Sequence, residues 1–317
     1  MPSSGTPISA IQPREATAAD HEAIAALFTR VYPHEPPVTA GQISWLVGRA
    51  DPERPKVVVV AEADGDIVGS AYLRGAPPLP GLILNVEVAP DHRRRGIATR
   101  LLEAVDAASG PHRLPTTVSV LASDLGSLAF AARHGFVERD RRSESKVDLT
   151  TFDVDRFADV LQEAAARGIR FAVMADVDAP EMRRRLFALA NQVTGDMPSI
   201  DPMEPMTYDQ FVASWLEATH SRPDLLVIGF DGDEPVAVSM VTEFPGGMAY
   251  NWMTGVMPSH RGHGLGLAAK VEALRRAKAS GIAEVWTENH NRNAPMLAIN
   301  ARLGYEAMPE VIQLVRG

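Results

Sequence analysis

The chain has 317 residues, of which 45% are hydrophobic and 22% are charged, and it carries a formal net charge of −9. This length suits two domains of ordinary size, each able to bury its own core, and the composition is that of a globular protein. No run approaches the ~18–20 apolar residues needed to span a bilayer, and the first residues lack a signal-peptide pattern, so we expect a cytoplasmic protein with no membrane partner.

The residue types also exclude several kinds of site. Cysteine is absent, which removes disulfides, thiolate metal ligands and cysteine nucleophiles. The histidines lack the spacing of metal ligands, so we predict no metal site. The acidic balance argues against a nucleic-acid partner, because phosphate neutralisation needs clustered Lys and Arg, and it favours cationic or amine ligands.

The first half of the chain alternates helical and strand patterns after a flexible lead over residues 1–13. Apolar spacing typical of an amphipathic helix alternates with β-branched runs, two of which flank an Asp64-Gly65-Asp66 hairpin turn. The predicted strands cover residues 56–63, 67–73, 82–88 and 117–121, with closing strands over 136–149. The predicted helices cover residues 20–32, 98–108 and 127–134.

The second half repeats this order. Its predicted helices cover residues 180–193, 207–218, 265–280 and 295–303, and its strands cover 225–230, 236–242, 249–257 and 283–287. Because hairpins mix with helical crossovers, we predict an α/β (α+β) fold in which each half has a mixed, mostly antiparallel sheet with helices on both faces. We assign residues 1–148 to an N-terminal domain, 149–170 to a connecting segment with its own helix, and 171–317 to a C-terminal domain.

One short motif occurs in both halves. Residues 93–98 read RRRGIA and residues 261–266 read RGHGLG, so both fit the pattern R-x-x-G-x-G/A. An Asp-Gly-Asp turn lies 32 residues before Gly96 and 33 before Gly264, and a Gly-aromatic pair begins 39 and 40 residues after them. A proline also lies six residues before each of these two glycines, Gly96 and Gly264, at Pro90 and Pro258. Four landmarks that agree within one residue indicate an internal repeat of one fold.

The repeated turn has the properties of an anion site. The first turn of a helix has backbone N–H groups without intrahelical acceptors, and the helix dipole adds partial positive charge there. Phosphate groups bind readily at such a helix start, and glycine lets them reach the backbone. The flanking arginines could add charge-assisted contacts.

With the strand before it and the Gly-aromatic pair about 40 residues after it, this turn resembles that of the GNAT superfamily of acetyl-CoA-dependent N-acetyltransferases. The resemblance covers both halves and implies two tandem GNAT folds that use acetyl-CoA (coenzyme A). It implies that backbone amides near Val88 and Val256 hold the thioester carbonyl, where the strand separates from its neighbour at a bulge. The residues implied in binding the coenzyme A phosphates are Arg93, Arg94, Arg95, Gly96, Ile97 and Ala98 in one half, and Arg261, Gly262, His263, Gly264, Leu265 and Gly266 in the other.

The resemblance also suggests catalytic and substrate residues. Glu288, at the end of a strand, is our first candidate for the base that deprotonates the acceptor amine, and Glu87, inside an apolar strand, is the second. In many family members a tyrosine four residues before the glycine of the Gly-aromatic pair acts as the general acid. This chain has Ala131 and Asn300 at those positions, and Asn300 could still bind the cofactor. We expect Asn291 and Asn293 to hold the pantetheine arm, and we expect Tyr250 and Trp252, which alternate on one strand, to line the acceptor pocket.

The resemblance implies direct attack of a small-molecule primary amine on the thioester. The C-terminal half has three glycines in its turn against one in the first half, which favours it as the active one. The missing tyrosines motivate an alternative, in which both halves bind acyl-CoA as a sensor or scaffold without catalysis. The acceptor stays open, and so does the choice between a monomer, with its halves as a pseudo-dimer, and a homodimer.

Overall fold

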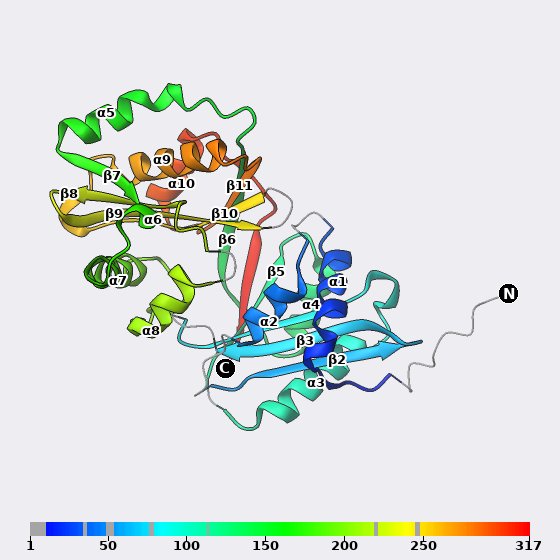
Figure 1. Cartoon of the computed structure of the whole chain (residues 1–317). Helices are drawn as coiled ribbons and strands as arrows, with labels where there is room; N and C mark the ends of the chain where they lie inside the picture. Colours follow the sequence, from blue (N-terminus) through cyan, green and yellow to red (C-terminus); the bar gives the residue numbers. More distant parts are fainter. Residues whose placement is uncertain are drawn as a thin grey trace. The chain divides into compact units, whose positions relative to one another are not determined.

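The computed structural model describes residues 11–33, 37–48, 54–75, 79–112, 114–218, 221–244 and 248–317. The chain forms two compact units (Figure 1). The N-terminal unit contains Met1–Val120, Asp124–Arg139 and Gln313–Gly317, and the C-terminal unit contains Leu121–Ser123 and Asp140–Ile312. Of the predicted flexible lead, residues 1–10 lie outside the described residues.

The sheet of the N-terminal unit has the order β1-β2-β3-β4-β5, with only β4 and β5 parallel. Helices cover both faces, since Phe28 of α1 packs on Tyr72 with ring centroids 6.4 Å apart, whereas a Cβ at Gly69 would lie 3.0 Å from Ile97 of α3. The strands are β1 (Arg14–Glu15), β2 (Val57–Ala63), β3 (Asp66–Gly75), β4 (Leu82–Val88) and β5 (Thr116–Leu121). The helices are α1 (His21–Val31), α2 (Ala40–Gly48), α3 (Ile97–Ser109) and α4 (Leu125–Arg133).

The sheet of the C-terminal unit has the order β7-β8-β9-β10-β11-β6, with β10 and β11 parallel and the other pairs antiparallel. Its strands are β6 (Val137–Asp148), β7 (Ile169–Val173), β8 (Leu226–Asp231), β9 (Glu234–Phe244), β10 (Met248–Val256), β11 (Glu284–His290), β12 (Glu306–Ala307) and β13 (Val311–Arg316). Only residues from Asp140 onward of β6 belong to this unit, and β13 passes into the N-terminal unit at Gln313.

Two cores cover the two faces of this second sheet, and the alternation of β8 explains the division. Val227 packs in a core with α5 (Ala158–Ala166) and α9 (Leu265–Ala279). Its neighbours Leu226 and Ile228 pack in a core with α7 (Pro180–Gly195) and α8 (Tyr208–Phe211). Because successive strand side chains point to opposite faces, a continuous apolar strand feeds both cores. Helices on both faces of a mixed sheet confirm the predicted fold class.

Most predicted elements are present, with a few differences. Helix α2 and strands β7 and β13 were not predicted. The helix predicted over 207–218 is α8 followed by a π-helical turn, Val212–Leu216. The remaining helices are α6 (Met174–Val177) and α10 (Ala294–Arg302). Strand β11 runs three residues beyond its predicted end at Thr287, so Glu288 lies within the strand.

Candidate active site

The two Arg/Gly turns have the same backbone conformation. Gly96 and Gly264 precede α3 and α9 with φ of 76° and 75°, in the left-handed region. Two residues earlier, Arg94 and Gly262 also have positive φ, 63° and 79°. The sequence repeat is therefore a structural repeat, and Arg94 adopts a conformation that an L-residue takes at some cost.

The first arginine of each turn is bonded to the preceding strand. Arg93 Nε donates to the carbonyl of Val88 at 3.1 Å, and Arg261 Nε donates to that of Val256 at 3.0 Å. Arg261 also forms an ion pair with Asp196, the C-cap of α7. These two arginines therefore hold the end of the central strand against the turn, and part of their donor capacity is already used.

The glycines leave space for a ligand at each helix start. A Cβ built at Gly96, Gly262 or Gly264 would meet no atom within 4 Å, and no side chain caps α3 or α9 at its N-cap residue. At Gly266 a Cβ would make only ordinary contacts, 3.5 Å from Ile299 and 3.6 Å from Val256. Exposed backbone N–H groups in an open cradle are what a pyrophosphate requires, so both turns fit the phosphates of coenzyme A.

Next to each turn, two parallel strands separate. Strands β10 and β11 pair only from Met248 to Tyr250 along β10, and β10 has a bulge between Asn251 and Met253. Strands β4 and β5 pair only at Leu82 and Ile83, and β4 runs along β3 without a register shift. Both central strands thus leave their parallel neighbour before they reach the turn. Only β10 has the bulge expected from the sequence.

Asn251 and Thr287 stabilise the separation in the C-terminal unit. The buried Asn251 amide donates to the carbonyl of Met240 at 2.9 Å and to that of Met253 at 3.3 Å. Thr287 Oγ1 donates to the carbonyl of Asn251 at 3.0 Å. These side chains satisfy backbone groups that the bulge takes out of the ladder. Sequence reasoning missed both residues, since neither belongs to a motif.

Tyr250 and Trp252 lie together at this point, as predicted from their alternation. Their ring centroids are 4.3 Å apart, and Trp252 Nε1 donates to Thr242 Oγ1 at 2.7 Å. Trp252 is 49% exposed, which is unusual for a large aromatic side chain on a central strand. The bulge places it outside the core, where it is available for contact with a ligand.

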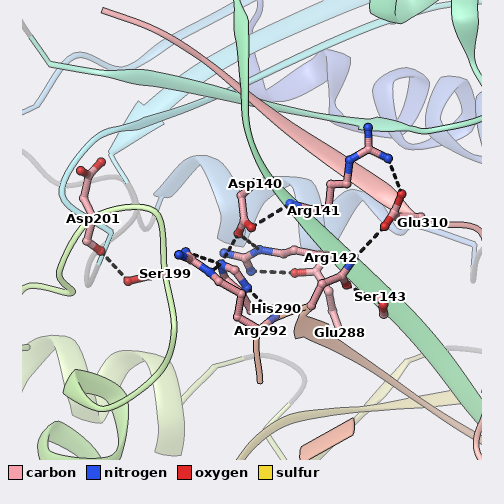
Figure 2. Close-up of polar contacts among 11 residues, drawn as sticks. Asp140, Arg141, Arg142, Ser143, Ser199, Asp201, Glu288, His290, Arg292 and Glu310 are labelled. Carbon is pink, nitrogen blue, oxygen red and sulfur yellow. Dashed lines mark hydrogen bonds and ion pairs between the residues drawn. The ribbon is translucent and has the colours of Figure 1, made fainter. Parts of the chain in front are cut away.

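Glu288 lies on β11 in a cluster of charged side chains (Figure 2). Arg142 of β6 donates to Glu288 Oε1 from Nη1 at 2.7 Å. Arg142 stands directly opposite His290 in the strand pairing, so Glu288, His290 and Arg142 share one face of the sheet. The structure therefore gives Glu288 a cationic partner from a strand near the middle of the chain.

Asp140, His290 and Arg292 complete this cluster (Figure 2). His290 Nε2 lies 2.7 Å from Asp140 Oδ2, and its Nδ1 accepts from the backbone N–H of Arg292 at 3.1 Å. Burial lowers the pKa of His290, although the charge of Asp140 opposes this shift. Sequence reasoning missed these residues, but a signal was present: Asp140, Arg142, Glu144 and Lys146 alternate along β6 and must share a face.

The three predicted asparagines all have protein partners. Asn291 accepts from Ser143 at 2.6 Å and donates to Glu310 at 2.7 Å. Asn293 is the N-cap of α10, where its side chain accepts from the backbone N–H of Met296 at 3.3 Å. These contacts favour turn and cap roles, which asparagine commonly fills.

Asn300 is buried and takes part in a polar chain inside the C-terminal unit. It accepts from Lys270 Nζ at 2.5 Å and donates to Asn289 Oδ1 at 2.6 Å. Lys270 Nζ also lies 4.5 Å from the centre of the Tyr305 ring. Burial lowers the pKa of Lys270 to about 7, because an ammonium loses its hydration there.

Glu87 lies in the N-terminal unit at the end of β4 and is only 1% exposed. Ser70 on β3 lies directly opposite and donates to Glu87 Oε2 at 3.4 Å. Burial, and then the charge of Glu87, raise the pKa of Tyr72. Glu87 is thus far less accessible than Glu288, whose carboxylate side chain is 24% exposed.

Comparisons with known proteins agree with this architecture. The sequence model of the acetyltransferase (GNAT) family matches residues 21–136 and 186–305 of this chain. A mycothiol acetyltransferase from Clavibacter michiganensis subsp. michiganensis is 27% identical over 265 residues, which cover 83% of this chain and 80% of the relative.

Two solved structures share the fold along nearly the whole chain. One is a GCN5-related N-acetyltransferase from Sphaerobacter thermophilus, with 18% identity, a TM-score of 0.71 and coverage of 96% of this chain and 95% of the other. The second is a tandem GNAT protein from the clavulanic acid biosynthesis pathway, with 19% identity, a TM-score of 0.70 and coverage of 96% and 98%. Among the described residues, no helix is long and apolar enough to cross a membrane.

Proposed function

The chain belongs to the acetyltransferase (GNAT) family, and from this premise we propose that its C-terminal half transfers an acetyl group to the primary amine of a small molecule. The chain is an N-acetyltransferase that uses acetyl-CoA. The observation that carries the proposal is the position of a partly exposed carboxylate, Glu288, on the strand that separates from β10 beside the open turn at Gly264.

Each part of the site has a role in this proposal. Backbone N–H groups of residues 262–266 bind the phosphates, together with the side chains of Arg261 and His263. Acetyl-CoA supplies an acetyl group activated as a thioester. Backbone amides of β10 near Val256, freed where β10 and β11 separate, stabilise the developing oxyanion. Tyr250 and Trp252 form one wall of the acceptor site, and binding there supplies rate by positioning.

Glu288 is the proposed base. An aliphatic amine is protonated near neutral pH, so one proton must leave before the nitrogen can attack. The carboxylate of Glu288 accepts this proton, directly or through a water molecule, and the amine lone pair attacks the thioester carbon. The C–S bond then breaks, coenzyme A leaves as its thiolate, and the thiolate takes up the second proton of the attached nitrogen. The Arg142 guanidinium lies 2.7 Å from the Glu288 carboxylate.

The first half has the same turn, and we propose that residues 93–98 and the amides near Val88 bind a second acetyl-CoA. We place the chemistry in the C-terminal half because Glu87, the carboxylate on the corresponding central strand, is buried beside Ser70 and Tyr72. We also propose that residues 1–148 form the N-terminal domain, that residues 149–170 connect the two domains, and that residues 171–317 form the C-terminal domain. The similarity to a mycothiol acetyltransferase supports a small molecule as the acceptor.

The test compares Glu288→Gln with Glu284→Gln, a carboxylate on the same strand that pairs with Lys146 at 2.7 Å. Turnover of acetyl-CoA with D-glucosamine, spermidine and L-lysine is followed by release of free thiol. We expect Glu288→Gln to lower kcat about 100-fold or more, the usual size of a general-base contribution, with unchanged acetyl-CoA affinity. Glu284→Gln should retain activity.

Two outcomes would count against this proposal. Full turnover by Glu288→Gln would remove Glu288 from the mechanism. Tight acetyl-CoA binding by the wild-type protein with no turnover of any amine in the panel would favour the alternative function, a non-catalytic acyl-CoA sensor or scaffold.

A further inference from the structure

One guanidinium stands between two carboxylates in the charged cluster of the C-terminal unit (Figure 2). Arg142 Nη1 lies 2.7 Å from Glu288 Oε1, whereas Arg142 Nε lies 3.9 Å from Asp140 Oδ2. That Nε is buried and has no hydrogen-bond acceptor among the described residues. Arg142 is therefore bonded to Glu288 and lies close to Asp140, and its Nε–H has no acceptor among the described residues.

The negative charge of the buried Asp140 carboxylate is only partly compensated by its neighbours. Asp140 is 8% exposed, its Oδ1 accepts from the backbone N–H of Arg141 at 2.7 Å, and its Oδ2 lies 2.7 Å from the ring of His290. Burial lowers the pKa of His290, which disfavours the charged ring beside Asp140. Arg292 Nη2 lies 2.9 Å from the same ring nitrogen, Nε2, that faces Asp140. Asp140 Oδ2 itself is buried and has no hydrogen-bond partner among the described residues. A buried carboxylate is stable only when cations or hydrogen bonds compensate its charge.

Two further charged groups lie on this face of β6. Glu144 stands directly opposite Glu288 in the strand pairing, and Lys146 forms an ion pair with Glu284 at 2.7 Å. Arg142 is a cation bonded to Glu288 that has a second carboxylate, Asp140, close by.

An acceptor amine arrives as an ammonium, and it needs the carboxylate that Arg142 occupies. While Arg142 donates to Glu288 Oε1, that oxygen is not available to an incoming ammonium, so base catalysis at Glu288 requires that the Arg142 contact opens. A movement of about 1 Å would bring Arg142 Nε within hydrogen-bond distance of Asp140.

We propose that Arg142 is a positioning residue that exchanges partners during the reaction. It bonds to Glu288 in the free protein, and it moves to Asp140 when the acceptor ammonium takes its place. The ammonium then gives one proton to the Glu288 carboxylate and becomes a neutral amine, while the charge of Arg142 stays with Asp140. This inference rests on the proposed role of Glu288 as the base.

The test is the pH dependence of kcat/KM for the amine that the wild-type protein acetylates fastest among D-glucosamine, spermidine and L-lysine. The variants are Arg142→Met, Arg142→Lys and Asp140→Asn. Arg141→Met is the matched control, since Arg141 is the neighbouring residue of β6 and bonds to Glu310 instead. Melting temperature and acetyl-CoA affinity are measured for every variant, so that a folding defect is recognised.

For Arg142→Met we expect the acid limb of the profile to move to higher pH by about one unit, because the cation beside the proposed base is then absent. Arg142→Lys should move it back towards the wild-type position. For Asp140→Asn, Arg142 loses its second partner and stays on Glu288, so kcat/KM should fall about tenfold with unchanged acetyl-CoA affinity. Arg141→Met should match the wild-type protein.

An unmoved acid limb in Arg142→Met, or wild-type acceptor kinetics in Asp140→Asn, would overturn the exchange while leaving Glu288 as the base. Full turnover by Glu288→Gln would instead remove the base, and the exchange with it. Lower melting temperatures with a uniform loss of rate at every pH would assign Arg142 and Asp140 a purely structural role and would also overturn the proposal.

Discussion

At the residue scale, Lys270 shows how a charged side chain is accommodated inside the C-terminal unit. Its Nζ has three donors when protonated, and the contacts of the described residues are one acceptor, Asn300, and the face of Tyr305. Lys270 is 1% exposed. Burial with so few partners disfavours the ammonium form, and the pKa falls to about 7.

This shift predicts a stability that depends on pH. The pKa of Lys270 is lower in the folded protein, about 7, than its ordinary value of 10.5, so between these values the unfolded chain binds one more proton. Stability therefore rises with pH in this window. Replacing Lys270 with Met should remove about 2 kcal/mol of the rise between pH 7 and 9. Urea unfolding at several pH values measures the effect.

Lys56→Met is the control for this prediction, since Lys56 is exposed. It should leave the slope of stability against pH as in the wild-type protein. An unchanged slope in Lys270→Met would mean that the buried amine keeps its ordinary proton affinity.

At the element scale, α9 begins and ends with a glycine of positive φ. Gly264 precedes the helix with a φ of 75°, and Gly281 follows it with a φ of 85°. A Cβ at either position would meet no atom within 4 Å. Alanine should cost about 1–2 kcal/mol of stability at both positions, through the left-handed backbone alone.

The two ends differ in what they should bind. At Gly264 the methyl group would occupy the space in front of free backbone N–H groups, whereas Gly281 lies at the negative end of the helix. Gly264→Ala should therefore weaken acetyl-CoA binding at the C-terminal turn at least tenfold in a calorimetric titration, and Gly281→Ala should not. Equal affinities in the two variants would show that the phosphates do not lie on the start of α9.

At the scale of the whole molecule, the repeated turn predicts the number of cofactor sites. Both turns have the same φ values at their central glycines, an open cradle and an uncapped helix start. We expect calorimetry to give two acetyl-CoA molecules per chain. Gly96→Val should reduce this to one and leave amine acetylation intact, whereas Gly264→Val should abolish acetylation. A wild-type stoichiometry of one would show that a single turn binds the cofactor.

The sequence by itself determined the repeated architecture, and it predicts where the cofactor binds. The order of helices and strands, the Asp-Gly-Asp hairpins and the glycines at the helix starts depend on local backbone preferences and apolar periodicity, which neighbouring residues fix. The same local signals predicted that Gly96 and Gly264 begin helices and that Tyr250 and Trp252 lie together. Helix α2 and strand β7 were not predicted.

Only the tertiary structure decided what surrounds the proposed base. Arg142 lies 146 residues from Glu288 in the chain, and the antiparallel pairing of β6 with β11 brings them to 2.7 Å. Packing within each unit likewise buries Glu87 in the N-terminal unit and joins Asn300 to Lys270 in the C-terminal unit. The residues flanking Glu288 do not show which strand pairs with β11, because that pairing depends on a segment far away in the sequence. The chemical environment of a site is thus set by segments that are distant in sequence.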